Sequence, residues 1–261
     1  MICAGVDAGS RAVKVLLMDA DSRDVLGSGV CDQGIRQAEL AAGLLDRVLA
    51  ETGAAGEELA CAVATGYARN NVEPADTTIT EITCHARGVR HCAPEARTIV
   101  EIGGQDSKLI RLAGGGLVRD FAMNDRCAAG TGRFLEVVAE RLGAEIGRLG
   151  GMSRRSRRPA VISSMCVVFA ETEIIGLLAG GGEPDDIVAG VQKAVAARVA
   201  AMAGRHVEPP VLFTGGVAMI SGMCEALAEA LGQEVTVAPD PQMTGALGAA
   251  LLAAERCADK G

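Results

Sequence analysis

The feature that most constrains the fold is an arrangement that occurs twice: an apolar strand, a glycine-rich turn and a second strand. The first copy has predicted strands at residues 2–7 and 13–19, and the second has them at residues 98–102 and 107–112. Further strand and helix patterns follow each copy, and strands that alternate with helices are typical of α/β folds. We therefore predict two α/β halves, residues 1–96 and 97–243, with residues 244–261 packing back on the first half.

Hydrophobic periodicity predicts the other elements. Apolar residues at helical spacing predict helices over residues 37–51, 81–91, 132–142, 167–178, 185–203 and 245–256. Short apolar runs predict strands over residues 25–30, 59–65, 117–123, 161–163, 211–214 and 234–238. One more helix is predicted to end at Leu231, with Ser221 as its N-cap and Gly232 just after its last turn.

The composition argues against several classes of protein. Hydrophobic residues make up 49% of the chain and charged residues 22%, which is enough apolar mass for a sizeable core. The net charge is −8, with four Phe, one Tyr and no Trp, and this argues against a nucleic-acid partner, since phosphate binding needs a basic face and base stacking needs aromatic rings. No apolar run is long enough to cross a membrane, and the start is unlike a signal peptide, so we expect a cytoplasmic protein without a membrane partner.

The nine cysteines do not form the pattern of a disulfide framework or a zinc site. Their number is odd, and no C-x-x-C or C-x-x-H pair occurs. Cys127 and Cys166 each precede a predicted helix, whose partly positive N-terminus favours a thiolate or an anionic iron–sulfur cluster. Taken alone, each is more readily interpreted as a small buried residue. That interpretation is kept for the other seven, which are Cys3, Cys31, Cys61, Cys84, Cys92, Cys224 and Cys257.

The first glycine-rich turn has the residues that a phosphate site needs. Gly9 lets the backbone approach an anion, and the amides around Gly9 and Ser10 can form an anion nest. Asp7 can hold Mg²⁺ through water, and Lys14 can balance phosphate charge. A single turn of this kind is usually only structural, because glycine is common in turns.

Two later turns repeat this chemistry, each after an apolar strand. The second turn supplies a similar set of acid, glycine and amide groups, namely Glu101, Gly103, Gly104, Gln105 and Asp106. The third turn, Gly215, Gly216 and Val217, follows a buried strand and is suited to lie under an adenine or a ribose. Three such turns in order make nucleotide binding the better interpretation, although the chain has neither a P-loop nor a G-x-G-x-x-G fingerprint.

Two other features have a structural and a functional interpretation. We expect His85 to be a structural histidine rather than a general base, since single histidines are common in protein cores. The basic run Arg154, Arg155, Arg157 and Arg158 is expected to be a solvated loop before the predicted strand at 161–163, with docking of an acidic partner as the alternative.

Taken together, these motifs resemble a known family. The stretches that carry the resemblance are GVDAGSRAVK (5–14), ATGYARN (64–70), EITCHARG (81–88), EIGGQDSK (101–108), MNDRCAAGTGRFLE (123–136), ISSMCVVFAETEII (162–175), TGGVA (214–218) and GALGAALLA (245–253). They are similar to activators of 2-hydroxyacyl-CoA dehydratases and the related ATPase subunits of benzoyl-CoA reductases, within the sugar kinase, actin and Hsp70 ATPase superfamily.

The resemblance implies a fold and a set of site residues. The fold would be two actin-like (ribonuclease H-like) α/β subdomains with a nucleotide cleft between them. Asp7, Glu101 and Asp106 would serve ATP hydrolysis with Mg²⁺, and the nucleotide contacts would come from Gly9, Ser10, Lys14, Gly103, Gly104, Gln105, Gly215, Gly216 and Val217. Where the family is expected to have Asp in the second phosphate motif, this chain has Glu101, whose carboxylate is one methylene further from the backbone.

The resemblance also implies a cluster and partners. Cys127 and Cys166 would be ligands of a [4Fe–4S] cluster, and because such a cluster takes four thiolates, a twofold homodimer would supply the other pair. A ferredoxin or flavodoxin would donate the electron, which ATP hydrolysis would drive into a 2-hydroxyacyl-CoA dehydratase, a benzoyl-CoA reductase or a double-cubane-cluster reductase. The alternatives are a small-molecule (sugar) kinase of the same superfamily and a nucleotide sensor without electron transfer.

Overall fold

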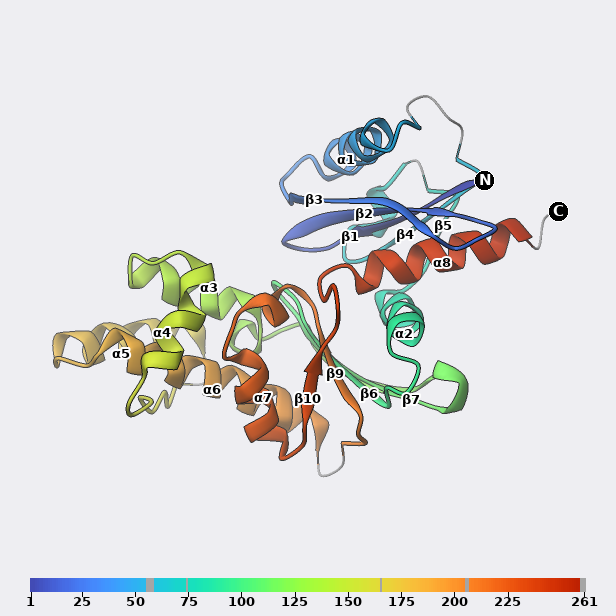
Figure 1. The fold of residues 1–261 in the computed structure, drawn as a ribbon. Helices are drawn as coiled ribbons and strands as arrows, with labels where there is room; N and C mark the ends of the chain where they lie inside the picture. The colour runs from blue at the N-terminus through green and yellow to red at the C-terminus, as the bar shows by residue number, and fades with distance from the viewer. Residues whose placement is uncertain (55–58, 74, 165, 205–206, 259–261) are drawn as a thin grey trace. The chain divides into compact units, whose positions relative to one another are not determined.

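The computed structural model describes residues 1–54, 59–73, 75–164, 166–204 and 207–258. The chain divides into two compact units (Figure 1). Unit 1 comprises residues 1–95, 112–118 and 243–261, and unit 2 comprises residues 96–111 and 119–242. Each unit contains a five-stranded sheet with both parallel and antiparallel neighbours and its own helices, which is an α/β architecture as predicted.

The sheet of unit 1 has the strand order β3-β2-β1-β4-β5. The strands are β1 (Ile2–Ala8), β2 (Ala12–Asp19), β3 (Val25–Asp32), β4 (Cys61–Thr65) and β5 (Thr77–Thr78). β1 is antiparallel to β2 and parallel to β4. The helices are α1 (Gln37–Glu51), α2 (Glu81–Cys92) and α8 (Thr244–Ala258).

The two faces of this sheet are covered by different helices, as the alternation of side chains along β1 dictates. Ala4 and Val6 face one way and belong to the core cluster that includes α1. Cys3 faces the other way and packs in the cluster that includes α2 and α8. At Gly5 the backbone of α8 lies directly against β1, so that a Cβ there would overlap Ala246 and Ala250. Figure 1 shows α1 and α8 on opposite faces of the sheet.

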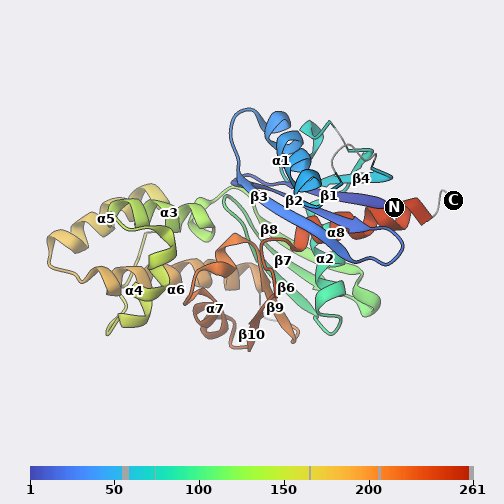
Figure 2. The same ribbon diagram turned by 45° about the horizontal axis from the view of Figure 1, so that its top comes forward.

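The sheet of unit 2 has the strand order β10-β9-β6-β7-β8. The strands are β6 (Thr98–Ile102), β7 (Ser107–Leu112), β8 (Val118–Asn124), β9 (Val211–Thr214) and β10 (Val235–Val237). The helices are α3 (Gly132–Arg141), α4 (Leu149–Arg155), α5 (Val167–Ala179), α6 (Pro184–Ala203) and α7 (Met223–Leu231). One core joins strand residues such as Val100 and Phe213 to all of these helices, and Figure 2 shows α3, α4 and α5 grouped beside one end of α6.

The structure corrects three predictions in unit 2. The predicted strand at residues 161–163 is absent, and at Ser163 and Ser164 the backbone is bound by the polar side chains of Glu173 and Arg198. Arg154 and Arg155 are the last residues of α4, a helix that was not predicted, so only the following residues of the basic run form a loop. Ser221 is not the N-cap of α7, which begins after Gly222 in a left-handed conformation.

Most other elements agree with the prediction to within a few residues. Gly232 follows α7 in the left-handed conformation expected of a helix C-terminus. Thr131 caps α3, with its hydroxyl accepting a hydrogen bond from the amide of Arg133 at 3.3 Å. Within the described ranges, no helix is both long and apolar enough to span a membrane.

Candidate functional site

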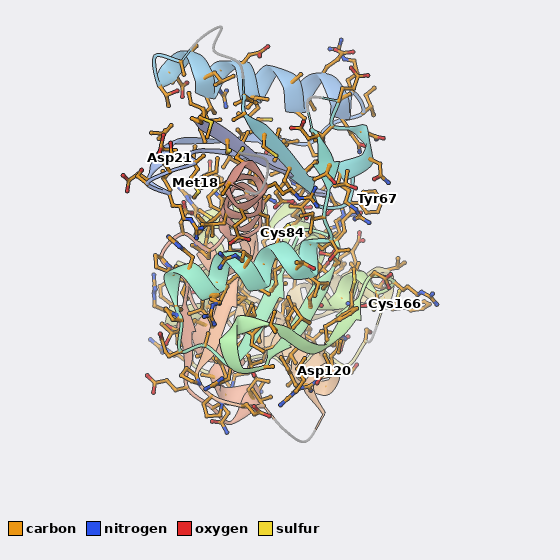
Figure 3. All side chains as sticks on the ribbon, turned by 90° about the vertical axis from the view of Figure 1, so that its right-hand side faces the viewer. Met18, Asp21, Tyr67, Cys84, Asp120 and Cys166 are labelled. Atoms are coloured by element: carbon orange, nitrogen blue, oxygen red, sulfur yellow. The ribbon has the colours of Figure 1, made fainter. Side chains whose placement is uncertain are left out.

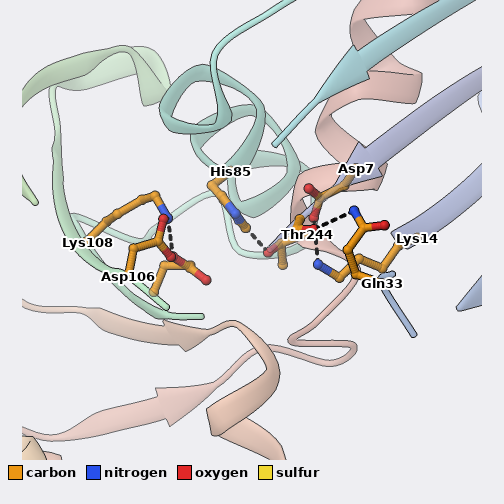
Figure 4. Close-up of polar contacts among 9 residues, drawn as sticks. Asp7, Lys14, Gln33, His85, Asp106, Lys108 and Thr244 are labelled. Atoms are coloured by element: carbon orange, nitrogen blue, oxygen red, sulfur yellow. Dashed lines mark hydrogen bonds and ion pairs between the residues drawn. The ribbon is translucent and has the colours of Figure 1, made fainter. Parts of the chain in front are cut away.

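The first hairpin turn presents a buried carboxylate beside a lysine. Asp7 on β1 lies directly opposite Lys14 on β2, and Lys14 Nζ is 3.0 Å from Asp7 Oδ2 (Figure 4). The turn is closed by a hydrogen bond from the Gly9 amide to the Ala12 carbonyl at 3.1 Å. Gln33, the residue directly after β3, also holds this turn, because its Nε2 donates to the Gly9 carbonyl at 2.9 Å. Gly9 and Ser10 themselves are half-buried, so their backbone is partly accessible.

The second hairpin turn has the same construction in unit 2. Glu101 on β6 lies opposite Lys108 on β7, and Lys108 Nζ is 2.8 Å from Glu101 Oε2. The same ammonium is 2.8 Å from Asp106 Oδ2, so one buried lysine binds two carboxylates. The Gly103 amide donates to the Asp106 carbonyl at 3.0 Å and closes the turn. Gln105, at the tip, is exposed.

The set of site residues predicted from the sequence does not include Lys108, although Lys108 belongs to the second hairpin. The signal for it was present, since the acid and the lysine are seven residues apart in both hairpins. The turn bonds are also equivalent, from Gly9 to Ala12 and from Gly103 to Asp106. The two units therefore carry two copies of one acid–lysine hairpin.

A second duplicated feature, a Thr-Gly pair, follows the strand parallel to each hairpin. Thr65 ends β4 opposite Asp7, and Thr214 ends β9 opposite Glu101. The next residues, Gly66 and Gly215, both have φ of +88°. A Cβ at Gly66 would lie 2.7 Å from the Ala8 carbonyl carbon, and one at Gly215 would lie 2.8 Å from the Ile102 carbonyl carbon. Both positions therefore require glycine for conformation and for space.

The predicted site includes the turn that follows the strand at residues 211–214, but not Thr65 and Gly66, which lie at the end of the equivalent strand in the first half. The quoted stretch ATGYARN contains the same Thr-Gly pair as TGGVA, and that repetition was the available signal.

The third turn presents backbone rather than side chains. Gly216 is exposed, while the Val217 side chain is buried in the core of unit 2. A ligand at this turn would therefore meet the Gly216 backbone. Two hydroxyls of unit 2, Thr214 Oγ1 and Ser107 Oγ, are buried and have no hydrogen-bond partner among the described residues. Buried hydroxyls of this kind are available to a bound polar ligand.

The second hairpin is hydrogen-bonded to the start of α3. The Gly132 amide donates to the Gly103 carbonyl at 2.9 Å, and the Arg133 amide donates to the Gly104 carbonyl at 2.8 Å. This links the predicted phosphate turn to the segment that follows Cys127.

Cys127 is exposed and stands at the beginning of a helical segment. It precedes a short 3-10 turn, Ala128–Gly130, which leads into α3. Asn124 holds the cysteine backbone on both sides: Asn124 Oδ1 accepts from the Cys127 amide at 3.0 Å, and Asn124 Nδ2 donates to the Cys127 carbonyl at 2.7 Å. The predicted position before a helix is correct, with the 3-10 turn as the difference.

Cys166 is also exposed and directly precedes α5 (Figure 3). The segment before it is held by Glu173, whose carboxylate accepts from the amides of Ser163 and Ser164, both at 2.9 Å. Burial acts to raise the pKa of Glu173, but the hydrogen bonds from these two serines outweigh it and lower the pKa to about 2. Arg198 of α6 adds a bond from Nη2 to the Ser164 carbonyl at 2.7 Å.

Cys127 and Cys166 are the two exposed thiols among the described residues. Within the described residues there is no group of three or more His, Cys, Asp or Glu side chains that could hold a metal ion. The chain offers two exposed cysteines, each at the start of a helical segment.

The other seven cysteines lie in less exposed places. Cys3, Cys61, Cys84 and Cys257 are buried, and Cys31, Cys92 and Cys224 are half-buried. Burial raises the pKa of the Cys84 thiol to about 12, so this thiol stays protonated at neutral pH and is a poor metal ligand.

His85 is buried and hydrogen-bonded, as expected of a structural histidine. Its Nδ1 is 2.9 Å from the hydroxyl of Thr244, the first residue of α8. The structure also places the ring near Asp7, because a Cβ at Gly245 would lie 3.0 Å from Asp7 Oδ2 and 3.3 Å from His85 Nε2.

Arg155, the last residue of α4, and the backbone that follows it are bound within unit 2. Arg155 makes two bonds of 2.8 Å to Asp185, and the amides of Arg157 and Arg158 both donate to Asp186 Oδ1 at 2.9 Å. The hydrogen bonds from Arg158, Ser156 and Arg157 lower the pKa of Asp186. Arg155 is therefore already engaged by a carboxylate of its own chain.

Known proteins resemble the chain over its whole length. It is 42% identical to a 2-hydroxyisocaproyl-CoA dehydratase activator of Clostridioides difficile, covering 97% of this chain and 95% of the relative. It is 42% identical to an activator of lactoyl-CoA dehydratase from Anaerotignum propionicum, covering 100% of both. The solved structure of the activator of 2-hydroxyisocaproyl-CoA dehydratase from Clostridium difficile, with bound ADPNP, has a TM-score of 0.95 and 41% identity over 100% of this chain and 97% of that one.

More distant structures show the fold alone. A ROK hexokinase from Thermus thermophilus has a TM-score of 0.51 at 19% identity, covering 99% of this chain and 100% of that one. The predicted actin-like α/β architecture is thus confirmed. Residues 4–253 match the BadF/BadG/BcrA/BcrD ATPase family, and the chain belongs to that family.

Proposed function

We propose that this protein is an ATP-driven activator that passes a low-potential electron to an iron–sulfur dehydratase or reductase. The relatives named as dehydratase activators, at 42% identity over nearly the whole chain, support this proposal. The observation that carries it is the pair of exposed cysteines, Cys127 and Cys166, each at the start of a helical segment in unit 2.

Cys127 and Cys166 of two copies would hold one [4Fe–4S] cluster. Bound there, the cluster would supply one-electron chemistry at low potential. The chain's own part is to fix the thiolates: Asn124 clamps the backbone of Cys127, and Glu173 and Arg198 hold the segment before Cys166. A reduced ferredoxin or flavodoxin is the proposed donor.

The second copy is supported by the surface next to Cys166. Val168 and Phe169 of α5 are each 69% exposed, and Ile175 is 50% exposed. Large apolar side chains gathered on one helix mark an interaction surface. A twofold axis beside this helix would bring two pairs of cysteines together, which is what a four-thiolate cluster requires.

The two hairpins are the proposed ATP site. Asp7 and Glu101 or Asp106 would orient Mg²⁺ and the attacking water, and Lys14 with the turn amides would balance phosphate charge. The backbone of Gly9, Ser10, Gly103, Gly104 and Gln105 would approach the phosphates, and Gly215, Gly216 and Val217 would contribute backbone to the adenosine end. Glu101 is one methylene longer than Asp, and Lys108 fixes its carboxylate in unit 2.

The hydrogen bonds between the second hairpin and α3 supply a route for coupling. A phosphate bound at the Gly103–Gly104 turn would constrain the carbonyls that receive the Gly132 and Arg133 amides. α3 begins five residues after Cys127, so nucleotide occupancy would be felt at the cysteine segment. ATP hydrolysis would then make the electron transfer unidirectional.

The test is the iron content of protein prepared without oxygen. We expect about four iron atoms per two chains and a loss of most of that iron in Cys127→Ala and Cys166→Ala, with ATP binding kept. Cys224→Ala, at a half-buried cysteine, is the matched control and should keep its iron. Wild-type protein that binds no iron and phosphorylates a sugar would instead establish the kinase alternative.

A further inference from the structure

We propose that Arg198 is a positioning residue that ties the two cysteine segments to one helix and thereby tunes the cluster they would hold. The proposal rests on the function proposed above. Arg198 belongs to α6 and is not itself a proposed ligand of the cluster.

The head of the Arg198 side chain reaches the Cys166 segment. Its Nη2 donates to the Ser164 carbonyl at 2.7 Å, two residues before Cys166. Its Nη1 donates to the Ala194 carbonyl at 2.8 Å, one turn back along α6, which fixes the direction of the side chain. Both terminal nitrogens of the guanidinium, Nη1 and Nη2, are therefore held by hydrogen bonds.

The stem of the same side chain lies against the Cys127 segment. A Cβ built on Gly130, the last residue of the 3-10 turn after Cys127, would lie 3.6 Å from Arg198 Cβ. The same Cβ would lie 3.2 Å from Asn124 Nδ2, the group that donates to the Cys127 carbonyl. α6 thus packs against this turn at the position of Arg198.

The other group that holds the Cys166 segment acts more locally. Glu173 belongs to α5, the helix that Cys166 begins, so its bonds fix the segment relative to α5. Arg198 belongs to α6, which also contacts the turn after Cys127, so its bonds relate one cysteine segment to the other. The spacing of the two thiolates then depends on Arg198.

The charge of Arg198 has a second consequence. A guanidinium bonded two residues from a thiolate ligand stabilises the more negative, reduced state of a cluster, which raises its reduction potential. Outer-shell partners of metal ligands also affect retention of the metal, typically by about 10–100-fold in affinity. Arg198 is expected to influence both properties.

Two variants separate geometry from charge. Arg198→Met keeps much of the stem and removes both hydrogen bonds and the charge. Arg198→Lys keeps the charge but cannot bridge Ala194 and Ser164 with a planar fork. Lys193→Met is the matched control. Lys193 lies on α6, as Arg198 does, and the substitution removes its exposed ion pair with Glu229 of α7.

The measurements are made on anaerobically reconstituted full-length protein: the rate at which a chelator removes iron, and the midpoint potential from an EPR-monitored redox titration. For Arg198→Met we expect about tenfold faster iron release and a more negative potential. Arg198→Lys should release iron several-fold faster than wild type with little change in potential, and Lys193→Met should match wild type in both.

The proposal is overturned if Arg198→Lys releases iron at the wild-type rate, or if Arg198→Met keeps the wild-type potential. If Arg198→Met does not fold, the iron-release rate of Arg198→Lys decides alone. Failure of the proposed function would look different, because wild-type protein would then bind no cluster, or Cys127→Ala and Cys166→Ala would retain it.

Discussion

At the scale of single residues, Gly66 and Gly215 combine a backbone conformation that favours glycine with close contact to neighbouring backbone. Each follows a buried threonine at the end of a parallel strand and turns with φ of +88° against the backbone of the neighbouring hairpin. A side chain at either place would meet both a conformational and a steric penalty. Gly232 has φ of +62° with open space around it, and it therefore isolates the conformational part.

We predict that Gly66→Ala and Gly215→Ala each lower the free energy of unfolding by about 2–5 kcal/mol, since the left-handed conformation alone costs about 1–2 kcal/mol and overpacking adds about 1–3 kcal/mol. Gly232→Ala should cost only the conformational part. Urea denaturation measures all three. Equal losses in the three variants would contradict the close packing at Gly66 and Gly215.

A second prediction at this scale concerns Lys108. Removing it by Lys108→Met leaves the carboxylate of Glu101, which is 4% exposed, without its ammonium partner, and breaking a buried pair in this way costs about 3–5 kcal/mol. The double variant Lys108→Met with Glu101→Gln should recover part of that loss, because the buried Glu101 side chain is then neutral, whereas the half-buried Asp106 carboxylate still loses its contact with Lys108. Urea denaturation of the single and double variants tests this, and a double variant less stable than Lys108→Met would refute it.

At the scale of elements, the backbone of the segment before Cys166 is bound by polar side chains where the sequence predicted a strand. Residues 161–163 were predicted to form a strand, yet the backbone of Ser163 and Ser164 binds the Glu173 carboxylate and the Arg198 guanidinium. The position of Cys166 before α5 could be predicted from helical periodicity. The absence of the strand could not, because Glu173 and Arg198 are distant in sequence and no local pattern pairs them with Ser163 and Ser164.

The acid dependence of this segment follows from Glu173. Its pKa is lowered to about 2 in the folded protein from an ordinary value of 4.5, so its contribution to stability is complete above about pH 4.5 and is lost as the pH falls toward 2. We therefore expect the difference in unfolding free energy between wild type and Glu173→Gln to be largest above pH 5 and to shrink on acidification. Urea titrations at several pH values measure it. A difference that does not change between pH 6 and pH 3 would show that the carboxylate is not held as described.

At the scale of the whole molecule, the sequence and the structure agree on duplication. The repeated strand–turn–strand pattern predicted two α/β halves, and each unit contains one acid–lysine hairpin followed by one parallel strand that ends in Thr-Gly. The return of α8 to the first sheet is a long-range contact. The direct approach of α8 at Gly5 was not predicted, since it depends on a missing side chain rather than on a visible pattern.

A substitution on the exposed apolar surface of α5 tests whether two chains assemble there. We predict that Phe169→Glu yields a monomer in sedimentation experiments and loses iron, because it places a charge on the proposed apolar contact. The matched control is Ile35→Glu, at a fully exposed apolar residue of unit 1, which should behave as wild type. A Phe169→Glu protein that remains a dimer with full iron would place the second copy elsewhere.

The contact of α8 with β1 also determines the order in which the molecule can form on the ribosome. Residues 119–242 of unit 2 are continuous and are synthesised after β1 and before α8. The face of the sheet that carries Cys3, Met18 and Val63 is therefore covered only in part, by α2, until Ala246 and Leu251 of α8 have left the exit tunnel. Unit 1 is therefore begun first and completed last. During that interval the nascent chain exposes apolar surface that a holdase chaperone would recognise.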